Sequence, residues 1–190
     1  MSEPAIYAIG RQFREELQRQ ERAAAMAMVQ HYGEMWGRIK RRLDALTGQY
    51  AELTAQGEPV NLAWLWEANR LTDLRGQVET EMAEFSRWAG VQVVDSQRDA
   101  VQLAMRFGRE AGLDLRWNQL PTGPLQDLIG FTRPGSPLKR LLDALGEAAG
   151  RSVEQELIAG VGLGSNPAEI ARRIRGALGG DLVRALKIAR

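Results

Sequence analysis

The amino-acid sequence predicts an all-α, elongated protein: two long N-terminal helices forming a hairpin or coiled-coil-like arm, followed by a C-terminal module of short helices. Three observations predict this fold. Apolar residues recur at three- and four-residue steps over two long stretches, and helix start and stop signals punctuate the rest of the chain. The β-prone run at residues 91–94 has no evident partner strand. A length of 190 residues suits one domain, or one domain with a helical arm.

The first predicted helix runs from about Glu3 to Ala55. Its apolar stripe keeps helical periodicity over about eleven turns, which is longer than an ordinary globular helix. Either the stripe packs within the same chain, or the helix is an exposed arm that meets an assembly partner. Gly33, Gly37 and Gly48 are weak points at which a break is expected. The stripe consists of Phe13, Leu17, Ala24, Met28, Tyr32, Met35, Ile39, Leu43, Leu46, Tyr50 and Leu53.

A second helix is predicted from Leu62 to Ala89, with Asn61 as its N-cap. The breaker cluster at 56–60 lets the two long helices lie antiparallel. Trp64 and Trp66 stand two residues apart and cannot share one helix face. We treat both as hypothetical interface anchors, because Trp is enriched at binding hot spots, with a second intrachain contact as the alternative. The predicted stripe is Leu62, Leu65, Trp66, Leu74, Val78, Met82, Phe85 and Trp88.

Between residues 91 and 150 the signals predict a break, a helix, a loop and another helix. Gly90 is expected to end the second helix, and Ser96 to cap a third one that runs to about Gly112. Residues 113–136 are rich in Pro and Gly and read as a loop with one helical turn at 125–130. Pro137 begins a further helix, and Gly150 with Ser152 marks the next boundary. The predicted segments are therefore 1–90, 91–150 and 151–190.

The C-terminal module has strong local signals. Asn166 is a good N-cap and Pro167 suits the first helical position. Ile170, Ile174 and Leu178 form the apolar stripe of the helix that follows. Gly179-Gly180 is expected to stop this helix before a last helical segment. The glycine-rich run 160–164 reads as a turn between helices, because it lacks the strand and the Gly-Lys-Ser/Thr ending of a phosphate loop.

The end of the chain is basic although the whole chain carries a net charge of only +1. Residues 166–190 hold six Lys or Arg and two Asp or Glu, which is +4. The basic side chains form a hypothetical partner-binding or DNA-binding face. Three interpretations stay open: a face that is only solvated, contact with an acidic protein surface, and contact with the DNA backbone. A second basic run, Arg38 to Arg42, reads mainly as a solvated face. The C-terminal set is Arg172, Arg173, Arg175, Arg184, Lys187 and Arg190.

The composition argues against several kinds of chemistry. Cysteine is absent and His31 is the single histidine, so thiolate sites, multi-histidine metal sites and a Ser-His-Asp triad are poorly supported. No carboxylate pair has the spacing of an acid/base site. We therefore expect no enzyme activity, no catalytic residue, no metal and no cofactor. No apolar run is long enough for a transmembrane helix, and no signal-peptide core is present. We therefore expect an intracellular product, or one packaged into a particle made inside a cell.

Residues 151–190 contain Leu157, Gly160, Gly164, Asn166-Pro167, Glu169 to Arg175, Arg184 to Leu186, and Ile188 to Arg190. With these residues the segment resembles the C-terminal half of the conserved region of phage Mu F-type head morphogenesis proteins, also called minor head or minor capsid proteins. The resemblance implies a structural protein of a tailed-phage head, present in several copies at the portal vertex of the virion and assembled in the host cytoplasm. It implies the portal protein as partner, with the major capsid protein as a further candidate, and a link to DNA packaging or ejection. An alternative is a carrier region whose toxin or transferase domain lies beyond residue 190.

Overall fold

The computed structural model describes residues 5–58, 60–112 and 137–189, without the side chains of 137–139, 141–143 and 180–189. The fold is all-α, as predicted, and no strand occurs in the described part of the chain. The elements are α1 (Ala5–Ala55), α2 (Leu62–Trp66), the short 3-10 helix η1 (Glu67–Asn69), α3 (Arg70–Glu110), α5 (Pro137–Gly162) and α6 (Pro167–Ala189). The predicted helical turn at 125–130 lies outside the described residues.

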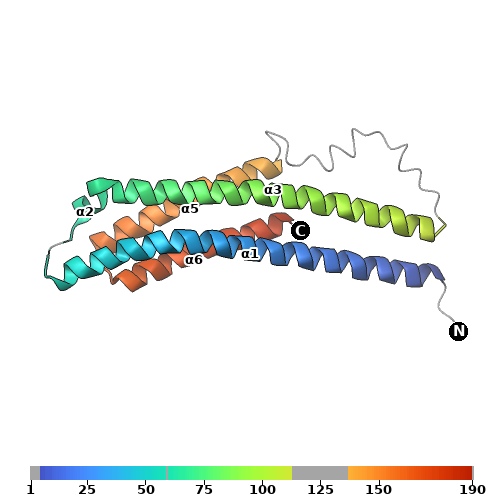
Figure 1. The fold of residues 1–190 in the computed structure, drawn as a ribbon, viewed down its shortest axis with the longest axis horizontal. Helices are drawn as coiled ribbons and strands as arrows, with labels where there is room; N and C mark the ends of the chain where they lie inside the picture. The colour runs from blue at the N-terminus through green and yellow to red at the C-terminus, as the bar shows by residue number, and fades with distance from the viewer. Residues whose placement is uncertain (1–4, 59, 113–136, 190) are drawn as a thin grey trace.

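The molecule is elongated, with α1 and α3 lying antiparallel along its full length (Figure 1). Arg38 of α1 pairs with Glu81 of α3 at 2.6 Å, and much further along the same two helices Phe13 meets Phe107 edge-on at 5.8 Å. The antiparallel pairing predicted from the turn at 56–60 is confirmed. Helices α5 and α6 run beside only one half of this pair (Figure 1). The described helices therefore form a four-helix half and a two-helix arm.

The core lies in the four-helix half. In α1 every predicted stripe residue from Met28 to Tyr50 is buried, whereas Phe13, Leu17 and Ala24 in the arm are only half-buried. The difference follows from the two extra helices, because an apolar stripe is removed from water only where a neighbour covers it. The core residues contributed by the C-terminal helices are Leu145, Ala149, Val153, Leu157, Val161, Ile170, Ile174 and Leu178.

A chain of aromatic side chains crosses the bundle from its surface to α6. His31 stacks on Trp88 at 4.2 Å between ring centroids, and the Phe85 ring lies 6.2 Å from Trp88. Phe85 in turn meets Tyr32 edge-on at 5.3 Å. The Tyr32 hydroxyl donates a hydrogen bond to the backbone carbonyl of Leu178. His31 is thus a boundary residue, as the sequence indicates, and this aromatic chain connects α1 and α3 to α6.

Ion pairs on the surface join α3 to α5. Arg75 donates to Glu79 of its own helix at 2.8 Å and to Glu154 of α5 at 2.9 Å. The hydrogen bond to Glu79 and then the charge of Glu154 raise the pKa of Arg75. The guanidinium is therefore charged at physiological pH, and its contact with Glu154 joins the two helices.

Three predicted helix ends are wrong. α3 continues through Gly90 to Glu110, α5 continues through Gly150, and α6 continues through Gly179-Gly180 to Ala189. Each glycine costs a helix about 1 kcal/mol, which neighbouring packing outweighs. Gly90 and Gly150 are buried. The segment boundaries drawn at 90/91 and 150/151 therefore lie inside helices, and the C-terminal module consists of two long helices rather than several short ones.

The first helix has no break at Gly33, Gly37 or Gly48, because α1 is continuous for 51 residues. The second predicted helix is instead divided. Asn61 is its N-cap as expected, accepting a hydrogen bond from the Ala63 N–H at 2.9 Å. However, α2 ends after five residues, and the long helix begins again at Arg70.

The turn between α5 and α6 closes as its residues predict, although α5 runs through Gly160 and Gly162 before it ends. Only Gly164 has a positive φ, 63°, and the N–H of Ser165 bonds the Gly160 carbonyl at 2.8 Å, the pattern of a Schellman cap. Asn166 then accepts from the Ala168 N–H at 2.9 Å and starts α6.

We expect Asn166→Ala to lower the free energy of unfolding by about 1 kcal/mol, because the first turn of α6 loses its side-chain acceptor. Urea denaturation followed by circular dichroism measures this loss. Asn166→Ser, which keeps an acceptor, is the matched control and is expected to remain close to the parent chain. An equal loss in both variants would show that the cap contributes nothing.

Candidate interaction surfaces

Helix α2 presents two neighbouring tryptophans to opposite environments. Trp64 is buried, with its ring 6.1 Å from that of Tyr50, whereas Trp66 is 56 % exposed. The two side chains therefore point to different faces, as their spacing predicts. Trp64 lies in the chain's own core, and only Trp66 is placed to anchor a partner. Leu62 is 40 % exposed, so its predicted inward position is wrong.

The residues that follow α2 fix its orientation. Ala68 and Asn69 both adopt left-handed backbone conformations, with φ of 50° and 55°. This geometry costs a non-glycine residue about 1–2 kcal/mol. Arg70 offsets the cost by donating to the carbonyls of Trp64 at 2.9 Å and Glu67 at 3.1 Å while its guanidinium lies 4.8 Å from the Trp64 ring centroid. The strained kink turns the chain into α3 directly after Trp66.

The exposed side of α2 adjoins the turn between α5 and α6. A Cβ placed on Gly162 would lie 3.6 Å from Leu62 Cδ2, so the two segments are in contact. The next residue, Leu163, is 78 % exposed. Leu62 and Trp66 share one face of α2 because they are four residues apart. We call these three side chains, Leu62, Trp66 and Leu163, the apolar tip; it lies at the end of the four-helix half (Figure 1).

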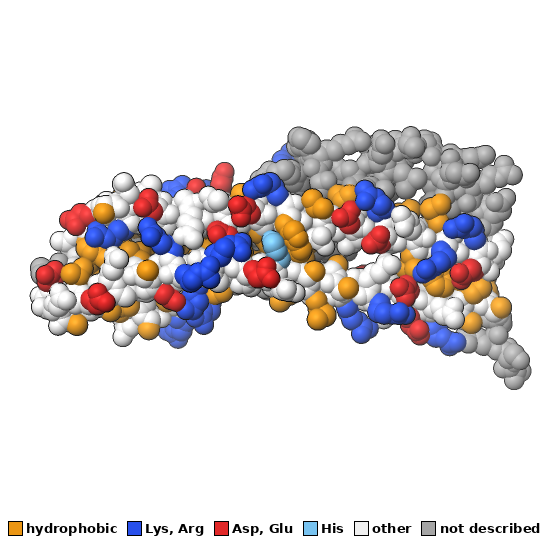
Figure 2. All heavy atoms as spheres, in the orientation of Figure 1, with side chains coloured by type: hydrophobic (Ala, Val, Ile, Leu, Met, Phe, Trp, Pro, Cys, Tyr) orange, Lys and Arg blue, Asp and Glu red, His pale blue; other side chains and the backbone are white. Residues whose placement is uncertain are grey.

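Carboxylates surround the apolar tip. Residues 52–69 and 152–171 contain six Glu and no Lys or Arg. The three in the second stretch each have a basic partner: Arg75 for Glu154, and Arg173 for both Glu156 and Glu169. In the first stretch Glu67 lies 3.8 Å from Arg70, and Glu52 and Glu58 have no ion pair with any described residue. Figure 2 shows hydrophobic side chains reaching the surface between acidic ones at this end. The tip therefore carries excess negative charge.

The structure divides the basic residues of α6. Arg172 and Arg175 are exposed and make no ion pair with a described residue. Arg173 instead turns toward α5, with its Nε 3.2 Å from Glu156 and its Nη2 3.4 Å from the Ser165 hydroxyl. Of the six residues predicted to form one basic face, Arg173 therefore belongs to the α5–α6 contact. The side chains of Arg184 and Lys187, and the whole of Arg190, lie outside the described residues.

A flat strip surrounds the two exposed arginines. Ala168, Gly176 and Gly179 are exposed, and nothing lies within 4 Å of a Cβ placed on either glycine. By helical spacing these three residues share the side of α6 that carries Arg172 and Arg175. We call the five residues the α6 outer face. It combines positive charge with backbone that no described side chain covers.

The second basic run on α1 is largely paired. Arg38 bonds Glu81, Lys40 bonds Asp44, and Arg42 lies 3.6 Å from Asp73. Exposed ion pairs of this kind stabilise weakly, by up to about 1 kcal/mol, but they reduce the positive charge available to a ligand. Within the described chain, the α6 outer face is the more open basic surface.

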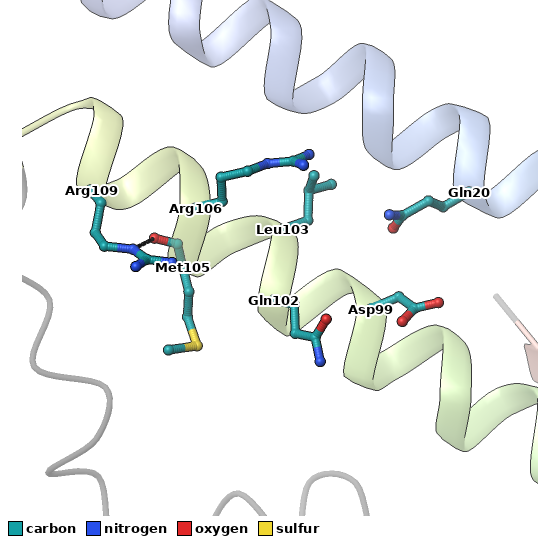
Figure 3. Close-up of a pocket in the computed structure, with 7 residues that line it drawn as sticks. All are labelled: Gln20, Asp99, Gln102, Leu103, Met105, Arg106 and Arg109. Atoms are coloured by element: carbon teal, nitrogen blue, oxygen red, sulfur yellow. Dashed lines mark hydrogen bonds between the residues drawn. The ribbon is translucent and has the colours of Figure 1, made fainter.

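A groove of about 430 Å³ lies between α1 and α3 in the arm (Figure 3). Leu103 and Arg106 point toward α1, and the Gln20 Oε1 atom is buried without a hydrogen-bond partner among the described residues. No pattern in the sequence signals this groove. Its polar groups do not converge on a reacting atom, and the lining has both signs of charge. The lining residues are Gln20, Asp99, Gln102, Leu103, Met105, Arg106 and Arg109.

Within residues 5–58, 60–112 and 137–189, no group of three or more His, Asp or Glu is arranged to hold a metal ion. No helix in the described part of the chain has both the length and the apolar composition needed to cross a bilayer. The site residues that the structure brings forward are therefore those of the apolar tip and the α6 outer face. No family model, curated protein or solved structure matches the chain.

Proposed function

We propose that this chain is a structural assembly protein of a tailed-phage head, associated with the portal vertex and connected with DNA packaging or ejection. The portal protein is its proposed partner and the major capsid protein a further candidate. The proposed location is the virion, in several copies, after assembly in the host cytoplasm. The chain acts by docking its helices against a larger assembly.

The proposal depends on where the residues that carry the resemblance to the phage family lie in the structure. Leu157 and Ile170 are buried in the core, and a Cβ on Gly160 would lie only 2.5 Å from Ile170 Cγ1. Asn166 caps α6, and Arg173 pairs with Glu156 of α5. The resemblance therefore coincides with the contacts that hold α5 against α6. This supports the view that the residues carrying the resemblance join α5 and α6 into one packed helical pair.

The shape and surface of the molecule support a docking role. The α1–α3 pair extends beyond α5 and α6 as an arm (Figure 1), and the apolar tip exposes a tryptophan at the other end. Exposed large apolar side chains that cluster together commonly mark interaction sites. Both features suit a protein whose work is contact with other subunits.

Co-sedimentation tests this function. The purified chain is mixed with the portal ring encoded beside it, and the mixture is separated on a density gradient. We expect the chain to travel with the ring. The matched control is the same gradient run without portal rings, in which the chain is expected to stay at the top. A chain that stays at the top of the gradient in the presence of folded portal rings contradicts the proposal.

A second candidate function, binding of the DNA backbone, is favoured by the exposure of Arg172 and Arg175. We expect Arg172→Ala/Arg175→Ala to weaken DNA binding about equally for all sequences. The slope of the logarithm of the binding constant against the logarithm of the salt concentration should fall in magnitude by about one for each phosphate that is no longer neutralised. Fluorescence anisotropy over a salt series measures both. Arg173→Ala is the matched control, because Arg173 pairs with Glu156, and its effect on the slope should be small. Absence of binding at low salt excludes this function.

A further inference from the structure

We propose that the chain associates head to tail with copies of itself, through the apolar tip of one copy and the α6 outer face of the next. The inference goes beyond the proposed function, because it depends on two surfaces of this chain and on no phage component. It assigns an occupant to each surface: Trp66 packs on the strip of backbone at Gly176 and Gly179, next to Arg172 and Arg175.

The backbone around the apolar tip keeps Trp66 exposed. Trp66 is 56 % exposed although its neighbour Trp64 is buried. The left-handed residues Ala68 and Asn69, braced by Arg70, hold this arrangement at a cost in backbone energy. A strained backbone that leaves a tryptophan in water does not stabilise the folded monomer. The exposed indole is removed from water when it is buried against a second molecule, and Trp is among the strongest interface anchors.

The α6 outer face has the complementary form. Open space above Gly176 and Gly179 leaves room for a flat ring to contact the helix backbone. Arg172 and Arg175 are exposed one turn before that space, on the same side of the helix by their spacing. Arginine over the face of an indole is the most favourable common cation–π pair. The face is therefore suited to receive a tryptophan, and not only an anion.

The charges of the two surfaces also favour contact between the apolar tip of one copy and the α6 outer face of another. The tip carries Glu52 and Glu58, which have no described basic partner, whereas the α6 outer face carries two arginines without a described acidic partner. Two tips repel each other, and so do two α6 outer faces, which disfavours a symmetric dimer through either surface. Tip against face is attractive. Because the surfaces differ, the contact is heterologous, and it propagates into a ring or an open filament.

Sedimentation velocity of the full chain tests the inference. We expect the mean sedimentation coefficient to rise with protein concentration at low salt and to fall toward the monomer value at high salt. Trp66→Ser is expected to weaken association roughly thirtyfold. The matched controls are Val91→Ser and Arg22→Glu, which change an exposed apolar side chain on α3 and an exposed arginine in the arm. They are expected to leave association unchanged.

A mixing experiment distinguishes this contact from any other. Trp66→Ser/Leu163→Ser destroys the tip, and Arg172→Glu/Arg175→Glu destroys the face. Each variant alone is expected to be monomeric. Mixed in equal amounts, they form a dimer and nothing larger, because the mixture offers one intact tip for one intact face. Circular dichroism checks that both variants are folded.

Three results overturn the inference: a parent chain that is monomeric at every concentration, association that survives both variants, and a mixture that yields no dimer. These results are separate from the fate of the proposed function. A monomeric chain that still travels with the portal ring overturns only the head-to-tail contact. If the chain self-associates but does not travel with the portal ring, only the proposed phage role is overturned.

Discussion

Replacing Phe85 by alanine is expected to lower the free energy of unfolding by about 3–5 kcal/mol. The Phe85 side chain is 1 % exposed and contacts the rings of Tyr32, Trp88 and His31. Its removal leaves a cavity where α1 and α3 meet, and the four-helix packing around it limits collapse. Tyr32 then loses the ring that holds it under α6, so the loss extends beyond one side chain. Thermal and urea unfolding both measure the effect.

Phe107→Ala is the matched control for this substitution. Phe107 also packs against an aromatic ring on α1, but it lies in the two-helix arm and is only half-buried. We expect a loss of about 1 kcal/mol, because less apolar area is returned to water. Equal losses at the two positions would mean that the arm is packed as tightly as the four-helix half, which contradicts the division described above.

Replacing Gly160 by valine is expected to cost about 2–3 kcal/mol, because α5 and α6 touch at this residue. A Cβ there would lie 2.5 Å from Ile170 Cγ1 and 2.6 Å from its Cδ1, and Ile170 is itself buried in the core with no room to move aside. The two helices must separate or tilt to admit the new side chain. Chemical denaturation gives the loss directly.

Two further variants make the Gly160 prediction specific. Gly33→Ala, in an open position of α1, is expected to stabilise by about 0.5–1 kcal/mol, since helix propensity then acts alone. Ile170→Ala removes the atoms that a valine at 160 would strike. The combined variant should therefore lose less than the sum of the two single losses. Additive losses would show that the clash does not exist.

The local signals in the sequence are accurate where neighbouring residues decide the outcome. Asn61 and Asn166 cap their helices, Gly164 takes the left-handed conformation that ends α5, and the stripe of α1 from Met28 to Tyr50 is buried. Caps, glycine turns and periodicity are properties of a few consecutive residues. They do not depend on the rest of the fold, which is why they can be read from one sequence.

The same reasoning fails where distant packing overrides local preference. Gly90 and Gly150 are buried inside continuous helices, although each looks like a stop signal. The kink after Trp66, by contrast, has no glycine or proline to announce it. Nor does the pattern distinguish Arg173 from Arg172, because only the position of Glu156 on α5 turns Arg173 inward.

By itself, the sequence determined that this chain is helical, where its strongest caps and turns lie, and which face of α1 is apolar. Only the tertiary structure decided that α5 and α6 cover one half of the long pair, that Trp64 is buried while Trp66 is exposed, and that the α6 outer face remains open. The physical reason is the range of the interactions. Hydrogen bonding within a turn depends on residues close in sequence, whereas burial depends on helices distant in sequence that pack against the residue.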